Sequence, residues 1–145
     1  MASQSFRAGV VMIVRRDDGR ILACERADAP GSWQLPQGGL DVGEDPIDAA
    51  WRELGEETGL TSAHVRLVSE LPEWIAYEWP SDLDVAKFGK AVRGQVQKWF
   101  LFGVVDDEAP TPDVDGREFR DWSWIDLHRP RRRKPASGSI LPMRC

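Results

Sequence analysis

Gly38 to Leu60 reads GGLDVGEDPIDAAWRELGEETGL, and three glutamates within it are spaced three and four residues apart. This spacing would place Glu53, Glu56 and Glu57 on one face of a helix. Like charges at i,i+4 destabilise a helix by roughly 0.2–0.5 kcal/mol per pair, whereas a divalent cation would turn the same repulsion into oxygen ligation. We interpret the face as a candidate metal site. For the three glutamates alone, the alternative is a solvated acidic helix surface.

The residues around these glutamates indicate where the helix begins and ends. Asp45 suits the N-cap, and Pro46 fits the first helical position because the N–H that proline lacks is not needed there. Asp48 adds a negative charge at the positive end of the helix dipole, and Gly59 is expected to end the helix. The apolar stripe expected to pack on the core consists of Ile47, Ala50, Trp51 and Leu54. The glutamates lie beside that stripe, at the edge of the core.

Arg52 lies one helical turn before Glu56. A pair between them would hold the Glu56 carboxylate in one orientation, as the groups around a metal ligand commonly do. An ordinary i,i+4 surface pair is an equally good interpretation of the spacing.

The segment before the helix, Trp33 to Gly39, reads WQLPQGG and indicates a tight loop whose backbone can approach a ligand closely. Together, the loop and the helix resemble the signature of the Nudix hydrolases. That signature is Gly, five residues, Glu, seven residues, Arg-Glu-apolar, one residue, Glu-Glu, one residue and Gly-apolar. The matching positions are Gly38, Glu44, Arg52, Glu53, Leu54, Glu56, Glu57, Gly59 and Leu60.

Four further segments resemble one branch of this family, which holds the bacterial RNA 5′-pyrophosphohydrolases and the plant-type diadenosine tetraphosphate hydrolases. These segments are SWQLPQGG from Ser32, EWIAYEWP from Glu73, GQVQKWFLF from Gly94 and REFRDWSWID from Arg117. The resemblance covers about residues 6–126 and fails beyond them. We therefore predict a Nudix domain over residues 1–126 and an irregular basic tail, rich in arginine and proline, over residues 127–145.

Composition agrees with one compact enzyme domain. The chain has 145 residues, of which 41% are hydrophobic, and this is enough for a real core. Cys24 and Cys145 are too few for a disulfide framework, and no apolar run suits a signal peptide or a membrane span. We therefore expect a cytoplasmic protein with no membrane partner and no obligatory protein partner. The net charge of -5 argues against nonspecific binding to duplex nucleic acid through a basic face.

Period-two patterns predict strands at residues 6–14 and 21–24, around the turn Asp17-Asp18-Gly19. Further strands are predicted at residues 65–71, 74–77, 98–105 and 119–125. Strands on both sides of one strong helix favour an α/β fold with a mixed sheet, and the resemblance implies the Nudix α/β/α sandwich. A basic loop at residues 89–94 is either a solvated connection or a lid that steers phosphate.

The resemblance implies that a metal is bound by Glu53, Glu56 and Glu57, one of which could double as the general base. It also implies a ligand role for the Gly38 carbonyl oxygen, and Arg52 is grouped with the catalytic residues because it would orient a ligand. Glu118, in the segment REF, matches a further acidic residue that joins the metals or acts as the base. A solvated loop carboxylate is the alternative for Glu118.

Ligands that are all oxygen point to Mg²⁺, with Mn²⁺ as the alternative, because His64 and His128 are isolated and nothing suggests a zinc cluster. The resemblance places at the substrate Arg7, Tyr77, Gln95 and Lys98, and the Ser32 hydroxyl could donate to phosphate. An arginine at the edge of a strand, with no role in binding, is the alternative for Arg7. The leading hypothesis is removal of pyrophosphate from a 5′-triphosphorylated RNA end, and the near rival is hydrolysis of dinucleoside polyphosphates such as diadenosine tetraphosphate. A catalytically silent nucleotide-binding module is a third hypothesis, weakened because every acidic position of the signature is intact.

Overall fold

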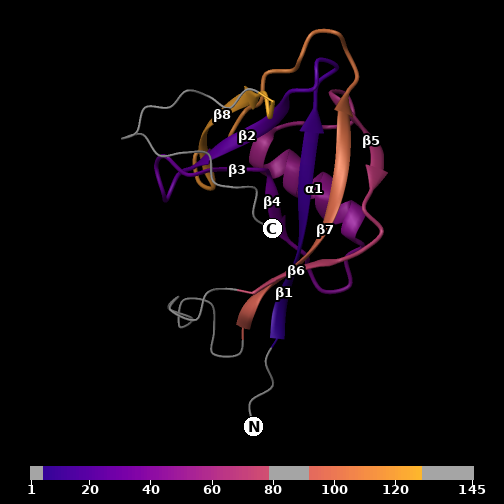
Figure 1. Cartoon of the computed structure of the whole chain (residues 1–145), viewed down its shortest axis with the longest axis vertical. Coiled ribbons are helices and arrows are strands. Elements are labelled where there is room, and N and C mark those ends of the chain that lie inside the picture. The colour runs from indigo at the N-terminus through magenta and orange to yellow at the C-terminus, as the bar shows by residue number, and fades with distance from the viewer. Residues whose placement is uncertain (1–4, 79–91, 129–145) are drawn as a thin grey trace.

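The computed structural model describes residues 5–78 and 92–128, which form one mixed sheet of eight strands and one helix (Figure 1). The elements are β1 (Ser5–Arg15), β2 (Ile21–Arg26), β3 (Trp33–Gln34), β4 (Gln37–Gly39), α1 (Pro46–Thr58), β5 (Val65–Glu70), β6 (Ile75–Glu78), β7 (Val92–Val104) and β8 (Phe119–Ile125). The strand order is β3-β2-β1-β7-β5, with β4 paired to β1, β6 to β7 and β8 to β2.

The long strands β1 and β7 run parallel at the centre, and every other pairing in the sheet is antiparallel. The helix α1 lies against one face of the sheet, behind β1 and β7 in Figure 1. Because side chains alternate between the faces of a strand, the two central strands divide their residues between α1 and the opposite face. The sheet therefore presents two different surfaces.

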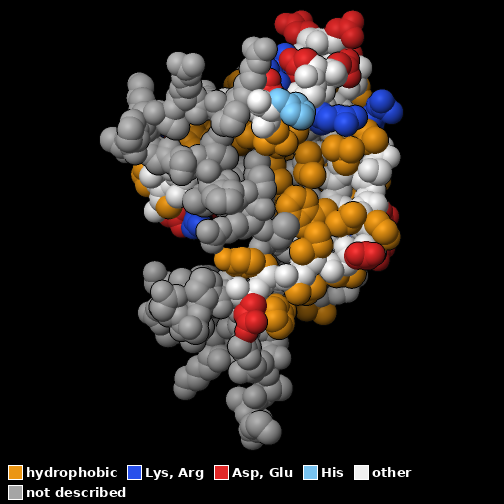
Figure 2. Space-filling view, in the orientation of Figure 1, with side chains coloured by type: hydrophobic (Ala, Val, Ile, Leu, Met, Phe, Trp, Pro, Cys, Tyr) orange, Lys and Arg blue, Asp and Glu red, His pale blue; other side chains and the backbone are white. Residues whose placement is uncertain are grey.

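Each face of the sheet has its own apolar cluster. Val10, Met12 and Phe102 belong to the cluster on the α1 face, together with Leu54 of the helix. The opposite cluster is smaller, and its members include Val11, Ala23, Leu35, Ile125 and the half-buried Ile13 and Trp99. Figure 2 views the molecule from this opposite side and shows hydrophobic side chains gathered over the centre of the sheet. The larger core thus supports the helix.

The mixed sheet and the loop–helix of the α/β prediction are confirmed. Within residues 5–78 and 92–128, α1 is the only helix, and it covers one face. The strand predicted at 98–105 in fact begins at Val92, because its polar first half is paired with β1 on one side and β6 on the other. The short strands β3 and β4 were not predicted, since two or three residues are too few to show a period.

The ends of α1 follow the sequence closely. Pro46 is its first residue and Gly59 follows its last turn in the left-handed conformation, but the Asp45 side chain makes no capping hydrogen bond. Of the predicted stripe, Ala50 and Leu54 are buried, whereas Ile47 and Trp51 are half-buried against the core. No helix in the described part of the chain has the length and apolar character that a membrane crossing requires. Residues 89–91 of the predicted basic loop and residues 129–145 of the predicted tail lie outside the described residues.

Gly59 should be replaceable only at a cost in stability. Its φ is 73°, and an added Cβ would lie 3.2 Å from the Asp113 Cβ. We expect Gly59→Ala to lower the free energy of unfolding in urea by about 1–2 kcal/mol. The matched control is Gly55→Ala inside the same helix, where the nearest contact of an added Cβ is 3.8 Å away and alanine is the better helix former. Equal unfolding free energies for wild type and Gly59→Ala would contradict the argument.

Candidate active site

The loop and the helix meet at Gly38. In β4, this residue lies so close to the Glu53 side chain that an added Cβ would overlap the carboxylate. Its carbonyl oxygen lies beside Gly9 of β1, where an added Cβ would come within 2.8 Å of it. Two glycines therefore let β1, β4 and α1 approach one another, and the close approach places the backbone of the loop against the glutamates.

The three glutamates of α1 differ in exposure. Glu57 is 3% exposed, the Glu53 side chain 13% and the Glu56 side chain 59%. Glu57 therefore lies inside the core rather than at its edge, where the sequence alone placed all three. The difference arises because β4 covers the helix at this point, and that strand was not predicted.

Burial and like charge strongly disfavour the ionised form of Glu57. Burial raises the pKa of its carboxyl to about 9, with further contributions from Glu53 and Glu118, while the Gln37 main-chain N–H opposes them through a hydrogen bond. Burial is also the main cause that raises the pKa of Glu53, although Arg52 opposes it. Among the described residues, Glu57 Oε2 has no hydrogen-bond partner. Such a site has a surplus of negative oxygen and is suited to a cation.

Arg52 ties the loop to the helix. Its Nε donates to Glu44 Oε2 and its Nη2 to Glu44 Oε1, both at 2.9 Å, and Nη2 also donates to the Gly39 carbonyl at 3.0 Å. Its Nη1 donates to Glu53 at 2.8 Å and to Glu56 at 3.4 Å. The expected pair with Glu56 is thus present but is the longest of these contacts, and Glu44 is the main partner.

Glu118 reaches the same region from a different part of the chain. It lies in the turn before β8, where its N–H donates to Asp115 Oδ1 at 3.0 Å and its carbonyl accepts from the Ala27 N–H at 2.9 Å. The side chain is exposed, and its charge contributes to the raised pKa of Glu57. Glu118 is therefore linked to α1 by the effect of its charge on Glu57.

The residues fit a divalent metal by two observations. The available donors are carboxylate and carbonyl oxygens, which suit Mg²⁺ or Mn²⁺, and the buried Glu57 Oε2 has no partner within the described part of the chain. As the side chains lie here, no three acidic, histidine or cysteine side chains of residues 5–78 and 92–128 converge tightly enough to hold an ion. Arg52 explains this, because it draws the Glu53 and Glu56 carboxylates toward itself.

The predicted substrate residues divide between the two faces of the sheet. Gln95 of β7 is the register partner of Arg7 on β1 and of Tyr77 on β6, so these three form one row on the face opposite α1. Lys98 points to the other face, where its Nζ donates to the Pro72 carbonyl at 2.8 Å. The same Nζ lies 3.5 Å from a Glu70 carboxylate oxygen. Lys98 thus does not share a face with Tyr77.

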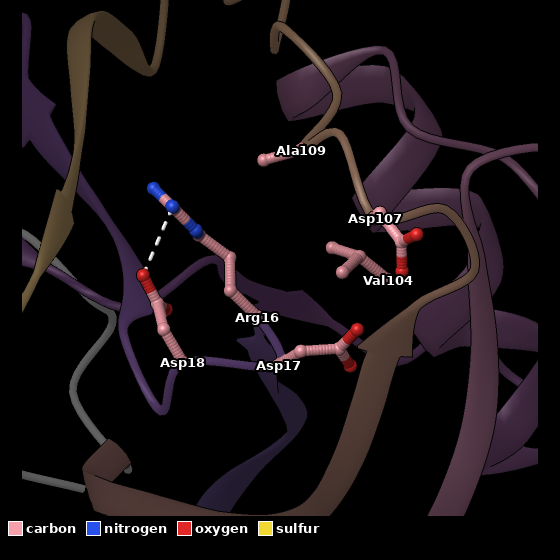
Figure 3. A pocket seen from close by; sticks show the side chains of 6 residues that line it. All are labelled: Arg16, Asp17, Asp18, Val104, Asp107 and Ala109. Atoms are coloured by element: carbon pink, nitrogen blue, oxygen red, sulfur yellow. Dashed lines mark ion pairs between the residues drawn. The ribbon is translucent and has the colours of Figure 1, made fainter.

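Ser32 lies in the loop between β2 and β3, half-buried, where its carbonyl accepts from the Arg26 N–H at 2.8 Å. A separate small hollow lies at the opposite end of β1 (Figure 3). There Arg16 pairs with Asp18 at 2.9 Å and lies over the Trp124 ring. Arg16 pairs with only one of the three aspartates that line the hollow, which are Asp17, Asp18 and Asp107. None of the glutamates of α1 lines it, and it is not the candidate site.

Sequence reasoning gave no role to two glutamines near the site, Gln37 and Gln97. Gln97 is 2% exposed, and its Nε2 donates to Gln37 Oε1 at 2.9 Å and to Gln95 Oε1 at 2.8 Å. The signal was present in GQVQKWFLF, because glutamines two apart share a face of a strand. This signal identifies Gln97 only if the predicted strand begins before residue 98, and the predicted strand began at residue 98.

The NUDIX domain matches residues 5–143 of the chain. A curated protein of Cereibacter sphaeroides named RNA pyrophosphohydrolase is 44% identical over 119 residues, which cover 81% of this chain and 72% of that relative. The solved E. coli dihydroneopterin triphosphate pyrophosphohydrolase has a TM-score of 0.69 at 21% identity, with 85% of this chain and 84% of that one covered. A C. elegans Ap4A hydrolase binary complex has a TM-score of 0.64 at 22% identity, with 84% and 81% covered. At these identities, the two structures show the fold alone.

We expect Glu57→Gln to lower Mg²⁺-dependent hydrolysis by at least about a hundredfold, because it removes one anionic oxygen from the cation site. The fold should be kept. With a pKa of about 9, the metal-free carboxyl is protonated at neutral pH and has the shape and charge of the amide. Thermal unfolding without metal should therefore barely change, and the exposed Glu108→Gln is the control for activity. Wild-type turnover of Glu57→Gln in saturating Mg²⁺ would disprove the metal role.

The pairing of Glu44 predicts a pH-dependent contribution to stability. Hydrogen bonds from Arg52 and from the Asp41 N–H lower the pKa of the Glu44 carboxyl to about 2, from an ordinary value of 4.5. A lowered pKa in the folded state stabilises the protein above pH 4.5, and this contribution is lost as the pH falls toward 2. Glu44→Gln should therefore reduce the Tm at pH 7, and its difference from wild type should shrink between pH 4.5 and 2. A difference independent of pH would refute the charge pairing.

Proposed function

The chain belongs to the Nudix family of hydrolases, enzymes that cleave phosphoanhydride bonds, and we propose that it removes pyrophosphate from triphosphorylated RNA 5′ ends with Mg²⁺. The observation that carries the proposal is the buried Glu57, whose Oε2 has no hydrogen-bond partner among the described residues. Its helix packs against β1 and β7, the strands that carry Arg7 and Gln95. The resemblance to a relative named RNA pyrophosphohydrolase over most of both chains supports the choice of substrate.

In this proposal, Glu53, Glu56 and Glu57 would hold the divalent metal, with the Gly38 carbonyl as a further oxygen ligand. Of the two roles open to Glu118, metal ligand or base, the proposal takes the base. A bound divalent cation neutralises phosphate oxygens and aligns the attacking water. Glu56, the exposed member, can turn toward a cation at little cost because its contact with Arg52 is long.

Proton transfer needs a carboxylate that faces solvent. Glu118 is exposed, lies outside the helix and is close enough to Glu57 to affect its pKa. We therefore assign to a Glu118 carboxylate oxygen the proton of the attacking water, and the buried Glu57 would serve as a metal ligand only. Arg52 keeps Glu53 and the loop in register with each other during this step.

The row on the opposite face suits the 5′ nucleotide and its phosphates. Arg7 is exposed near the start of β1, and its guanidinium can form paired hydrogen bonds with phosphate or stack on a base. Gln95 and Tyr77 add polar and aromatic surface in the same row. In a chain with a net charge of -5, a cation in this position provides a local attraction for an anionic substrate.

The near rival is hydrolysis of dinucleoside polyphosphates, which presents the same phosphoanhydride chemistry to the same residues. A product assay in Mg²⁺ separates the two functions. We expect wild type to release pyrophosphate and a 5′-monophosphorylated RNA from a triphosphorylated oligonucleotide, with a higher kcat/KM than on diadenosine tetraphosphate. Glu57→Gln should be inactive on both. A higher kcat/KM on diadenosine tetraphosphate would transfer the proposal to the rival, and no hydrolysis of either substrate would reject both.

Arg7→Ala should lower kcat/KM on triphosphorylated RNA by about tenfold, the usual effect of losing a hydrogen bond to a charged group. The loss on diadenosine tetraphosphate should be smaller, because its second adenosine offers another point of contact. Arg15→Ala, at the other exposed end of β1, is the matched control and should retain both activities. Ionic strength must be fixed, since phosphate contacts are sensitive to salt. An equal loss on the two substrates would make Arg7 a general phosphate or structural residue.

A further inference from the structure

We propose that Gln97 is a positioning residue, which turns the amides of Gln37 and Gln95 so that both present N–H donors to the substrate. The inference rests on the proposed function, because it concerns how the same site binds phosphate or base oxygens. It adds two residues, Gln37 and Gln97, to which neither the sequence pattern nor the resemblance assigned a role.

Gln97 is an amide inside the protein. It is 2% exposed, and its Nε2 uses both of its protons on glutamine side chains, at 2.9 Å to Gln37 Oε1 and at 2.8 Å to Gln95 Oε1. The contact with Gln37 joins residues that are 60 positions apart in the chain. Gln97 is therefore the centre of a row of three amides.

The contact between Gln97 and Gln37 crosses β1 at a glycine. Gln97 on β7 is the register partner of Gly9 on β1, and Gly9 is the partner of Gly39 on β4. Since Gly9 has no side chain, the Gln97 side chain can extend across β1 toward Gln37, which pairs with the next residue of that face, Val11. The three glutamines therefore share the sheet face that also presents Arg7 and Tyr77.

The direction of the hydrogen bonds fixes the orientation of the two outer amides. A primary amide has an oxygen that only accepts and a nitrogen that only donates. Because Gln37 and Gln95 both accept through Oε1, their Nε2 groups are turned away from Gln97. Phosphate oxygens and base carbonyls only accept, so two donors facing outward match them. Without Gln97, either amide could rotate and present an oxygen, which would repel phosphate.

Gln37 also touches the cation site. Its main-chain N–H donates to the Glu57 carboxyl, and the next residue, Gly38, packs against Glu53. The side chain of Gln37 therefore lies on the proposed substrate face, while its main-chain N–H is hydrogen-bonded to Glu57. A contact that fixes Gln37 places the donor for the substrate at a constant distance from the metal ligands.

A purely structural role does not account for an amide at this position. Gln97 Oε1 is buried and has no hydrogen-bond partner among the described residues, which is unfavourable for stability. A methionine would fill nearly the same space with no unpaired oxygen. The value of the amide lies in its two donated hydrogen bonds, and these act on Gln37 and Gln95.

The test is Gln97→Met, assayed with triphosphorylated RNA in Mg²⁺. We expect KM to rise about tenfold, as for the loss of oriented donors to phosphate, with kcat within about twofold of wild type because the metal ligands are unchanged. The amide NH₂ signals of Gln37 and Gln95 in ¹⁵N NMR spectra should shift in the variant, and this readout needs no turnover. Gln34→Met, a half-buried glutamine of β3, is the matched control and should keep the wild-type KM.

An unchanged KM in folded Gln97→Met, or a fall in kcat at constant KM, would overturn the inference. If Gln97→Met does not fold, Gln37→Glu and Gln95→Glu decide it. Each keeps an oxygen that accepts from Gln97 but replaces the outward donor with a carboxylate oxygen, so both should raise KM, and wild-type KM values would overturn the inference. If wild type does not hydrolyse triphosphorylated RNA, the proposed function fails. The Gln97 variants are then compared on diadenosine tetraphosphate, whose phosphates offer the same acceptors.

Discussion

The close contact between β4 and the carboxylates of α1 is the constraint on which the site depends. It requires glycine at position 38, because any larger residue would overlap Glu53. It requires a cation between loop and helix, and Arg52 is that cation, bonded to Glu44, Glu53 and the Gly39 carbonyl. The same contact covers Glu57 and removes its carboxyl from water. Local rigidity and a surplus of negative oxygen thus have one structural origin.

This constraint explains which parts of the site the sequence predicts. Glu53, Glu56 and Glu57 are fixed relative to one another by helical spacing alone, and the helix ends are marked by Pro46 and Gly59. Their different burial depends on β4, a strand of three residues with no detectable period. The main partner of Arg52 also lies outside the helix, because Glu44 precedes the N-terminus of α1. Patterns within one element were predictable, and contacts between elements were not.

Register is the second limit on prediction. Tyr77, Gln95 and Lys98 lie in segments that resemble one family branch. The register of β7 with β1 and β6 shows that Lys98 faces away from the other two. A shift of one residue along a strand exchanges the faces of the sheet. The sequence predicted this strand at residues 98–105, so its start was six positions too late, and Gln95 and Gln97 were left outside any predicted strand. Their shared face became visible only with the full length of the strand.

The two faces of the sheet must act together, because the carboxylates lie on the α1 side and the row around Gln95 lies on the other. A substrate that contacts both faces must pass an edge of the sheet where few side chains obstruct it. β4 provides that edge: it consists of Gln37, Gly38 and Gly39, two of which have no side chain. Gln37 is the residue of this strand that bonds toward both sides, through its main chain to Glu57 and through its side chain to Gln97. In the proposed function, its buried partner Gln97 would set the distance between the substrate and the carboxylates of α1, and a reaction that depends on positioning and charge requires that distance to be constant.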